Sequence, residues 1–288
     1  MSHTIHPIEY PQKYSHSMSF LTPNPTLLES KLSRFTPETT RVVTDFDSTL
    51  TADNGKTSWS LFADSGLMPE SYVVRRQVLK DRYYPYEIDL SLSETERSGY
   101  MRDWWIGHLE LLVEYGLHKD ILEQVVNHEM KIRTGMDSML QELEELSIPV
   151  LVLSAGITQS IESVLRNQNL LFQEISIASN SLIFNAEGIC QGIDTKQIIH
   201  VCNKDEWDAS ENVQETFKAR TNILLFGDSL DDIKMIRNEE RDSTIAVGFC
   251  TSNRVHQREK FLDTFDIVVE SNTGDGGVGK FLLERIKS

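Results

Sequence analysis

Short, nearly continuous apolar segments separated by helical patterns constrain the fold of this chain more than any other feature of its sequence. Five such segments are residues 41–46, 149–153, 222–226, 244–247 and 266–269. Strands as apolar as these are buried on both faces, and strands that alternate with helices form a parallel sheet with helices on both sides. The sequence therefore predicts an α/β fold built on a parallel sheet.

Residues 52–133 follow a different pattern. They lack a strand of this kind and contain long helical patterns, one of which begins at a capping box from Ser93 to Glu96 and ends near Gly116. Large side chains recur in this helix at spacings of four, three and four, at Met101, Trp105, His108 and Leu112. We predict that residues 52–133 form a helical cap domain inserted after the first strand.

The other domain boundaries follow from the same patterns. Residues 29–51 and 134–288 form the α/β core on either side of the cap, and residues 1–28, which contain four prolines, form an N-terminal arm. Within the core, residues 180–193 suggest a β-hairpin.

The charge of the chain excludes several kinds of partner. The formal net charge is −16, so the protein should repel nucleic-acid polymers and anionic membranes. Three cysteines without a C-x-x-C pair fit a reducing compartment better than a zinc site or a disulfide framework. The N-terminus lacks a signal-peptide pattern, and no apolar run approaches the roughly 18 residues that span a bilayer. We expect a cytoplasmic protein without membrane or nucleic-acid partners, and a monomer by default.

Polar clusters stand where three of the predicted strands end. Asp45 and Asp47 follow the first strand, residues 154–156 follow the second, and Asp228 and Asp232 follow the third. Because open α/β sheets bind ligands at the carboxyl ends of their strands, we expect these clusters to form one site.

The residue types in these clusters fit phosphoryl transfer. Asp45 can attack phosphorus, and Asp47 can protonate the leaving oxygen and later activate water. Clustered Asp oxygens without His or Cys, as around Asp228, suit a hard cation such as Mg²⁺. Ser154 precedes a helix whose N-terminus can bind an anion, and Lys204 can give a point charge to a phosphate group.

Four motifs, taken in order, resemble those of the haloacid dehalogenase (HAD) superfamily. The pattern D-x-D-x-T occupies residues 45–49, the second motif is Ser154, the third is Lys204, and the fourth is residues 227–229 with Asp232.

Longer blocks narrow the resemblance to the cytosolic 5′-nucleotidase III family, also called pyrimidine 5′-nucleotidases. The blocks are residues 44–50, 83–89, 100–105, 147–157 and 199–204. The resemblance implies a Rossmann-like core with an inserted helical cap. It also implies Mg²⁺-dependent hydrolysis of nucleoside 5′-monophosphates to nucleoside and phosphate.

The resemblance implies the chemical roles position by position. Asp45 is the nucleophile, which forms an aspartyl-phosphate, and Asp47 is the general acid and base. Asp45, the backbone carbonyl of Asp47 and Asp228 hold the metal, and Asp232 supports its outer shell.

The remaining positions are implied to bind the substrate. Ser154, Ala155 and Lys204 hold the phosphate group. Glu87 matches a cap glutamate that contacts the nucleobase.

Two tryptophans and a histidine bear on the choice of base. By register, Trp59 falls where a ring faces the base, and Trp105 falls at a second stacking position. Two indoles can sandwich a base, and a cationic ring gains most from them, so 7-methylguanosine monophosphate joins CMP and UMP as an expected substrate. His108 aligns with a family serine near the base.

Several of these residues also fit purely structural roles. Trp59, Trp105 and His108 fit a hydrophobic core, Glu87 fits a solvated surface, and Asp231 fits a helix N-terminus.

Three alternative functions remain open for the chain. One is a HAD phosphatase acting on another small phosphate ester, such as phosphoserine, and another is a phosphotransferase with a nucleoside acceptor. A third is a binding protein without catalysis, against which the complete set of motif residues argues.

Overall fold

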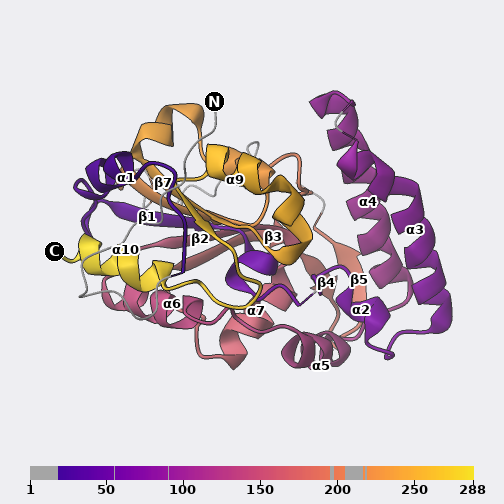
Figure 1. Ribbon diagram of the computed structural model, residues 1–288. Helices are drawn as coiled ribbons and strands as arrows, with labels where there is room; N and C mark the ends of the chain where they lie inside the picture. The colour runs from indigo at the N-terminus through magenta and orange to yellow at the C-terminus, as the bar shows by residue number, and fades with distance from the viewer. Residues whose placement is uncertain (1–18, 55, 90, 195–197, 205–216, 218) are drawn as a thin grey trace.

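A six-stranded parallel sheet forms the core of the protein (Figure 1). The computed structural model describes residues 19–54, 56–89, 91–194, 198–204, 217 and 219–288. The strand order is β3-β2-β1-β6-β7-β8, and every neighbouring pair is parallel. The strands are β1 (Thr40–Thr44), β2 (Val150–Ile157), β3 (Ile175–Asn180), β6 (Asn222–Gly227), β7 (Thr244–Phe249) and β8 (Ile267–Val269).

Five of the six strands were predicted from their apolar runs, and these predictions are confirmed. The apolar runs did not predict β3. This strand lies at the edge of the sheet beside β2, and most of its residues are only partly buried. An edge strand contains more polar residues than a central strand, so β3, with the sequence ISIASN, lacks a continuous apolar run.

Alternating strand residues face two opposite sides of the sheet, each covered by its own hydrophobic core. Val42, Phe226 and Val247 face the first core, whereas Val43 and Leu225 face the second. The first core is covered by α1 (Pro25–Leu32), α6 (Met136–Glu145), α7 (Thr158–Asn167) and α10 (Val278–Ile286). The second is covered by α9 (Arg258–Thr264), which lies across the sheet from α6 and α7 in Figure 1. The expected cover on both faces is therefore present.

Among the described residues, four α-helices lie between β1 and the core helix α6 in the chain. They are α2 (Leu61–Asp64), α3 (Glu70–Ile88), α4 (Glu94–Glu114) and α5 (Lys119–Glu129). The pair α3 and α4 stands apart from the sheet in Figure 1, whereas α5 packs against the core helix α7. The predicted capping box of Ser93 and Glu96 is present at the start of α4, and Gly116 follows its end with a φ of 59°.

The two linkers of this insertion run side by side. The Ala52 N–H donates to the Lys131 carbonyl at 2.9 Å, and the Arg133 N–H donates to the Leu50 carbonyl at 2.8 Å. These bonds form an antiparallel bridge between the two linkers. The paired linkers lie close to the boundaries of 52 and 133 that were predicted for the cap.

The remaining elements are short. The predicted hairpin is present as β4 (Leu182–Phe184) and β5 (Cys190–Ile193). One wide helical turn, Phe46–Leu50, follows β1, and short 3₁₀ helices span Leu230–Met235, Asn238–Ser243 and Ser252–Gln257. Among the described residues, no helix is both long and apolar enough to cross a membrane.

Most of the predicted N-terminal arm lies outside the described residues, which begin at Ser19. Its last part runs along the sheet, where the backbone of Leu21 exchanges two hydrogen bonds of 2.8 Å with Val268 of β8. Helix α1 begins at Pro25 and spans the predicted boundary at residue 28.

Candidate active site

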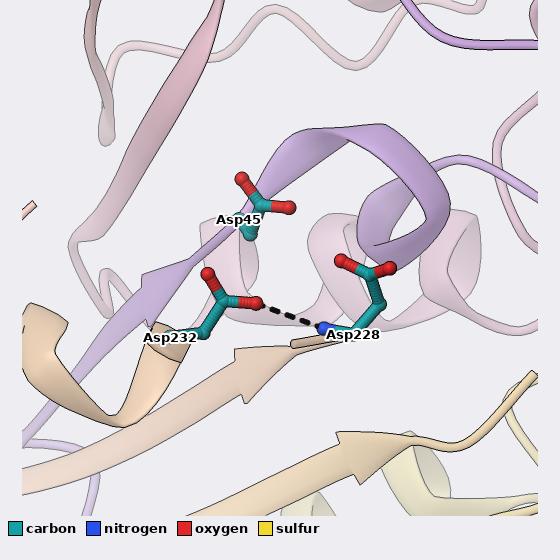
Figure 2. Close-up of side chains that lie close together, drawn as sticks. All are labelled: Asp45, Asp228 and Asp232. Carbon is teal, nitrogen blue, oxygen red and sulfur yellow. Dashed lines mark hydrogen bonds between the residues drawn. The ribbon is translucent and has the colours of Figure 1, made fainter. Parts of the chain in front are cut away.

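Three buried carboxylates meet at the carboxyl edge of the sheet. Asp45 follows β1, Asp228 follows the neighbouring strand β6, and Asp232 lies on the turn that comes next. One oxygen from each lies within 4.8 Å of the others (Figure 2). Asp232 Oδ2 accepts hydrogen bonds from the N–H groups of Asp228, at 3.0 Å, and Ser229, at 2.9 Å. Adjacent parallel strands thus bring together residues that are far apart in the sequence.

Lys204 lies inside this cluster. Its Nζ contacts Asp45 Oδ1 and Asp232 Oδ1, both at 2.7 Å, and its side chain is buried. Burial alone would lower the pKa of Lys204, but the charges of Asp232 and Asp45 outweigh it and raise that pKa. The lysine therefore remains protonated at neutral pH and compensates part of the negative charge.

The loop after β1 turns sharply so that Asp47 can face the same site as Asp45. Ser48 has a φ of 60°, a left-handed conformation that few residues other than glycine adopt. The Ser48 N–H bonds the Thr51 hydroxyl, at 3.0 Å, and the Thr51 N–H bonds the Phe46 carbonyl, at 3.0 Å. These bonds hold a conformation that is unfavourable in isolation.

Arg133 holds the same loop from the outgoing linker of the insertion. Its fully buried guanidinium donates to the carbonyls of Ser48, at 2.5 Å, and Thr49, at 3.0 Å. It also bonds the carbonyls of Ser271 and Gly274, beyond β8. Burial lowers the pKa of Arg133 to about 10, so the side chain stays charged near neutral pH.

The carboxylate of Asp47 bonds to the insertion rather than to the core. It accepts hydrogen bonds from the backbone N–H of Ser58, at 3.1 and 3.2 Å, and from the Ser58 hydroxyl, at 3.1 Å. Burial and the charge of Asp45 raise the pKa of Asp47 to about 7, against the bonds from Ser58.

Asp228 has a second cation beside it. Arg254 Nε contacts Asp228 Oδ2 at 3.2 Å, from the 3₁₀ turn that follows β7. Burial raises the pKa of Asp228 to about 6 although Arg254 acts in the opposite direction. Burial also raises the pKa of Asp45 to about 7.

The donor set of the cluster fits a divalent metal ion. Four carboxylates, those of Asp45, Asp47, Asp228 and Asp232, face two cations, Lys204 and Arg254, which leaves a formal charge of −2. Within the described chain, Asp45 Oδ2 and Asp228 Oδ1 accept no hydrogen bond. Free carboxylate oxygens in a negative site without His or Cys suit a hard cation.

The end of β2 supplies the next part of the site. The pairing of β2 with β3 is interrupted between Leu153 and Ile157, so the residues between them leave the regular ladder. The Ser154 hydroxyl accepts a bond from the Gly156 N–H at 3.0 Å, which leaves its own proton available to a ligand. The Ala155 carbonyl accepts bonds from Trp105 Nε1, at 2.8 Å, and Asn180, at 2.9 Å.

The two tryptophans lie against each other and against His108. The Trp59 and Trp105 ring centroids are 5.0 Å apart at an angle of 67°, so a base can enter between the rings only after one of them moves. His108 is buried, its ring centroid lies 4.6 Å from that of Trp59 at a tilt of 41°, and its Nε2 bonds the Tyr72 hydroxyl at 3.2 Å. Burial lowers the pKa of His108 to about 3, so the ring is neutral. The predicted contacts of these residues with a base stay predictions.

Glu87 lies near the end of α3. Burial raises its pKa, and the charges of Arg254 and Arg97 act in the opposite direction. The charge of the core residue Arg254, which contacts Asp228, thus acts on this carboxylate of the insertion. Asp231 lies outside the carboxylate cluster and pairs with Arg97 of α4 at 3.3 Å.

Several residues of the site were not predicted from the sequence. Arg254 had a usable signal, since it follows the carboxyl end of a predicted strand, as the motif residues do. Ser58 and Arg133 had none, because neither belongs to a strand end and their partners are distant in the chain. Asn180, which joins Ala155 to the Ile199 carbonyl at 2.8 Å, lies at the end of the strand that was missed.

Removal of the Arg133 guanidinium should destabilise the fold. Arg133→Met leaves four carbonyl groups without this donor, two of them in buried hydrogen bonds, and we expect the free energy of unfolding to fall by about 3 kcal/mol. Urea denaturation followed by circular dichroism measures this change. Arg75→Met is the matched control, since Arg75 pairs with Glu114 at the exposed surface and should leave the unfolding midpoint unchanged. Equal midpoints for both variants would contradict the role given to Arg133.

The raised pKa values of Asp45, Asp47 and Asp228 predict how pH affects metal binding. Between the usual carboxyl range and pH 7 the folded, metal-free protein holds more protons than the unfolded chain, so its stability falls as pH rises. A divalent cation needs the ionised carboxylates. The gain in melting temperature from MgCl₂ over EDTA should therefore be larger near pH 8 than near pH 5.5. Asp228→Asn should lose most of this gain, and an equal gain at both pH values would be inconsistent with the cluster as a metal site.

Solved structures share this fold. The structure is similar to that of cytosolic 5′-nucleotidase IIIB bound to cytidine, with a TM-score of 0.81 and 28% sequence identity over 93% of each chain. A HAD family hydrolase from Salmonella enterica serovar Typhi gives a TM-score of 0.56 at 16% identity, over 86% of this chain and 73% of that one. The predicted HAD-like Rossmann fold is confirmed.

Sequence comparisons agree with the fold. The human 7-methylguanosine phosphate-specific 5′-nucleotidase is 31% identical over 241 residues, which cover 81% of this chain and 80% of that protein. The family model described as Pyrimidine 5′-nucleotidase (UMPH-1) matches residues 43–287, a range that includes every residue of the site. The chain therefore belongs to the pyrimidine 5′-nucleotidase family, as the resemblance of its motif blocks predicted.

Proposed function

We propose that this chain is a magnesium-dependent 5′-nucleotidase that hydrolyses nucleoside 5′-monophosphates, with Asp45 as the nucleophile. The observation that carries the proposal is the buried cluster in which Lys204 bonds Asp45 and Asp232 beside Asp228. Membership in the pyrimidine 5′-nucleotidase family supports the reaction class.

The first step transfers the phosphoryl group to Asp45. Lys204 holds Asp45 Oδ1, and the other oxygen, which accepts no hydrogen bond within the described chain, is available to attack phosphorus. As this bond forms, the bond between phosphorus and the ribose O5′ breaks, and Asp47 gives its proton to O5′. The nucleoside leaves as an alcohol.

The second step returns the enzyme to its starting state. Asp47, now ionised, takes a proton from a water molecule, whose oxygen attacks phosphorus. The bond between phosphorus and Asp45 breaks, inorganic phosphate leaves, and the Asp45 carboxylate is free again. One carboxylate thus serves as acid and then as base, which suits a pKa near 7.

The residues that would hold Mg²⁺ are Asp45, Asp228 and the backbone carbonyl of Asp47. Asp232 suits the outer shell, because Lys204 occupies one of its oxygens and two backbone N–H groups occupy the other. When bound, Mg²⁺ would neutralise negative charge on the phosphate and on the cluster.

The phosphate group would lie between the ends of β1 and β2. Ser154 can donate its hydroxyl proton to a phosphate oxygen, the backbone of Ala155 lies where the ladder is interrupted, and Lys204 supplies a positive charge. These three residues come from two separate segments, so they can contact different oxygens of one phosphate.

We propose 7-methylguanosine 5′-monophosphate as a substrate, together with CMP and UMP. The name of the human relative supports the first. The cytidine bound to the solved 5′-nucleotidase IIIB supports the pyrimidine nucleotides. Trp59, which is partly exposed and adjoins Trp105, offers an indole to a cationic base, and the carboxylate of Glu87 complements its positive charge. His108 would support the Trp59 ring, against which it lies.

A cytosolic location and a monomeric state complete the proposal. A Caenorhabditis elegans relative, 26% identical to this chain, is named putative cytosolic 5′-nucleotidase 3, which supports the location.

Substitution of the nucleophile tests the mechanism. Asp45→Asn should lower kcat by roughly 10⁴-fold or more, because an amide cannot form the aspartyl-phosphate. Phosphate release from CMP and acid-stable labelling of the protein with radioactive phosphate measure both effects. Asp231→Asn, in the same region but outside the cluster, should keep most of the activity. Labelled, active Asp45→Asn protein would refute the assignment.

A comparison of two guanine nucleotides tests the choice of base. 7-Methylguanosine monophosphate differs from GMP by one methyl group and a positive charge, and a cation–π contact worth about 1–2 kcal/mol predicts a kcat/KM ratio of roughly 5 to 30. Trp59→Leu should bring this ratio toward one. A panel that also contains CMP, UMP and phosphoserine measures it, and a ratio near one in the unmodified enzyme would exclude selection by charge.

A further inference from the structure

Ser58 is a fully buried residue that the proposed reaction does not yet use. It lies in the turn before α2, between the incoming linker of the insertion and Trp59. The other residues of the insertion near the site are aromatic side chains and Glu87. A buried hydroxyl group on this segment needs a hydrogen-bond partner.

That partner is Asp47. The Ser58 N–H reaches both carboxylate oxygens, at 3.2 and 3.1 Å, and the Ser58 hydroxyl donates to Oδ1 at 3.1 Å. Among the described residues, no other group donates a hydrogen bond to this carboxylate. The orientation of Asp47 in the core is therefore set by one residue of the insertion.

Ser58 is itself fixed from the opposite side. A Cβ on Gly156, at the end of β2, would lie 2.8 Å from Ser58 Oγ and 3.1 Å from Ser154 Oγ. Only a glycine leaves room for this approach. The Ser58 hydroxyl thus lies between the Asp47 loop and the segment proposed to bind phosphate.

We propose that Ser58 is a positioning residue that aims Asp47 at the leaving oxygen, so that the insertion completes the proton-transfer geometry of the core. The inference rests on the proposed function. In the first step Asp47 gives its proton to the leaving oxygen as the phosphorus–oxygen bond breaks, and in the second it takes a proton from water. Both steps need the orientation that Ser58 provides, whereas the attack of Asp45 does not.

Leaving groups of different basicity separate these contributions. Phenyl phosphate and CMP release strongly basic oxygens that need the proton, whereas p-nitrophenolate departs without one. In single-turnover measurements, Ser58→Ala should slow the release of cytidine and of phenol by about 10-fold or more. The rate of the p-nitrophenolate burst should change by less than about 3-fold. The steady-state turnover of p-nitrophenyl phosphate should fall, because the attack of water on the aspartyl-phosphate still needs Asp47.

A double-mutant cycle tests whether Ser58 acts through Asp47. Asp47→Asn should show the same leaving-group pattern with a larger loss, and adding Ser58→Ala to it should cost nothing further. Ser60→Ala is the matched control, because the Ser60 hydroxyl accepts a bond from the Thr57 N–H rather than contacting Asp47. Ser58→Gly replaces the alanine variant if that protein does not fold.

The outcomes distinguish the inference from the proposed function. Equal losses for phenol and p-nitrophenolate in Ser58→Ala, or additive losses in the cycle, would overturn the positioning role. Hydrolysis of both aryl phosphates but of no nucleoside monophosphate would overturn the proposed substrate and leave the test of Ser58 on aryl phosphates valid. An unmodified protein without phosphatase activity would overturn both.

Discussion

The rest of the site depends on the ion pairs that the buried ammonium group of Lys204 forms. This group contacts Asp45 and Asp232, which follow two neighbouring strands, and it reaches them from a third segment of the chain. Three buried carboxylates within 4.8 Å of one another would repel strongly without it. Removing one partner from such a buried pair typically costs about 3–5 kcal/mol, because the remaining charge is left without compensation. The strand order β2-β1-β6 matters because it brings these segments to one edge of the sheet.

The sequence predicted the parts of this protein whose determinants are local. The apolar runs of the central strands and the capping box at Ser93 can each be recognised within a few residues, and both are present. The motif residues Asp45 and Asp228 were expected to lie together because polar residues at strand ends meet at one edge of a parallel sheet, whereas Lys204 was identified from the resemblance of the motifs. The comparison of motif blocks then identified the family.

What the sequence did not reveal depends on tertiary contacts. Arg133 bonds carbonyl groups on two loops that lie 84 or more residues away in the chain, and backbone acceptors leave no trace in a sequence. Ser58 contacts Asp47 across 11 residues that include a left-handed turn, so no regular spacing relates them. The angle between Trp59 and Trp105 depends on how α4 packs on the core. A register can suggest that two rings are near a base but cannot give their orientation.

The proton-transfer and base-recognition parts of the site are adjacent in the chain. Ser58, which bonds the acid, and Trp59, which lies near the expected base position, are consecutive residues on the insertion. A movement of Trp59 to admit a base would therefore act on the segment that orients Asp47. The nucleophile and the metal ligand Asp228, by contrast, belong to the core, where Lys204 contacts Asp45 and Arg254 contacts Asp228.

The paired linkers also bear on how such an enzyme can diversify. The residues near 51 and 132 lie side by side, about 5 Å apart, as neighbouring strands do. The chain therefore leaves the core and returns to it at one place, as it does at a short hairpin loop. The length and sequence between the linkers can then change at little cost to the sheet, provided that Arg133 is kept. Recombination at these two points would exchange substrate preference as a module while the nucleophile and the expected metal ligands stay in place, provided that the new insertion supplies a donor to Asp47 as Ser58 does.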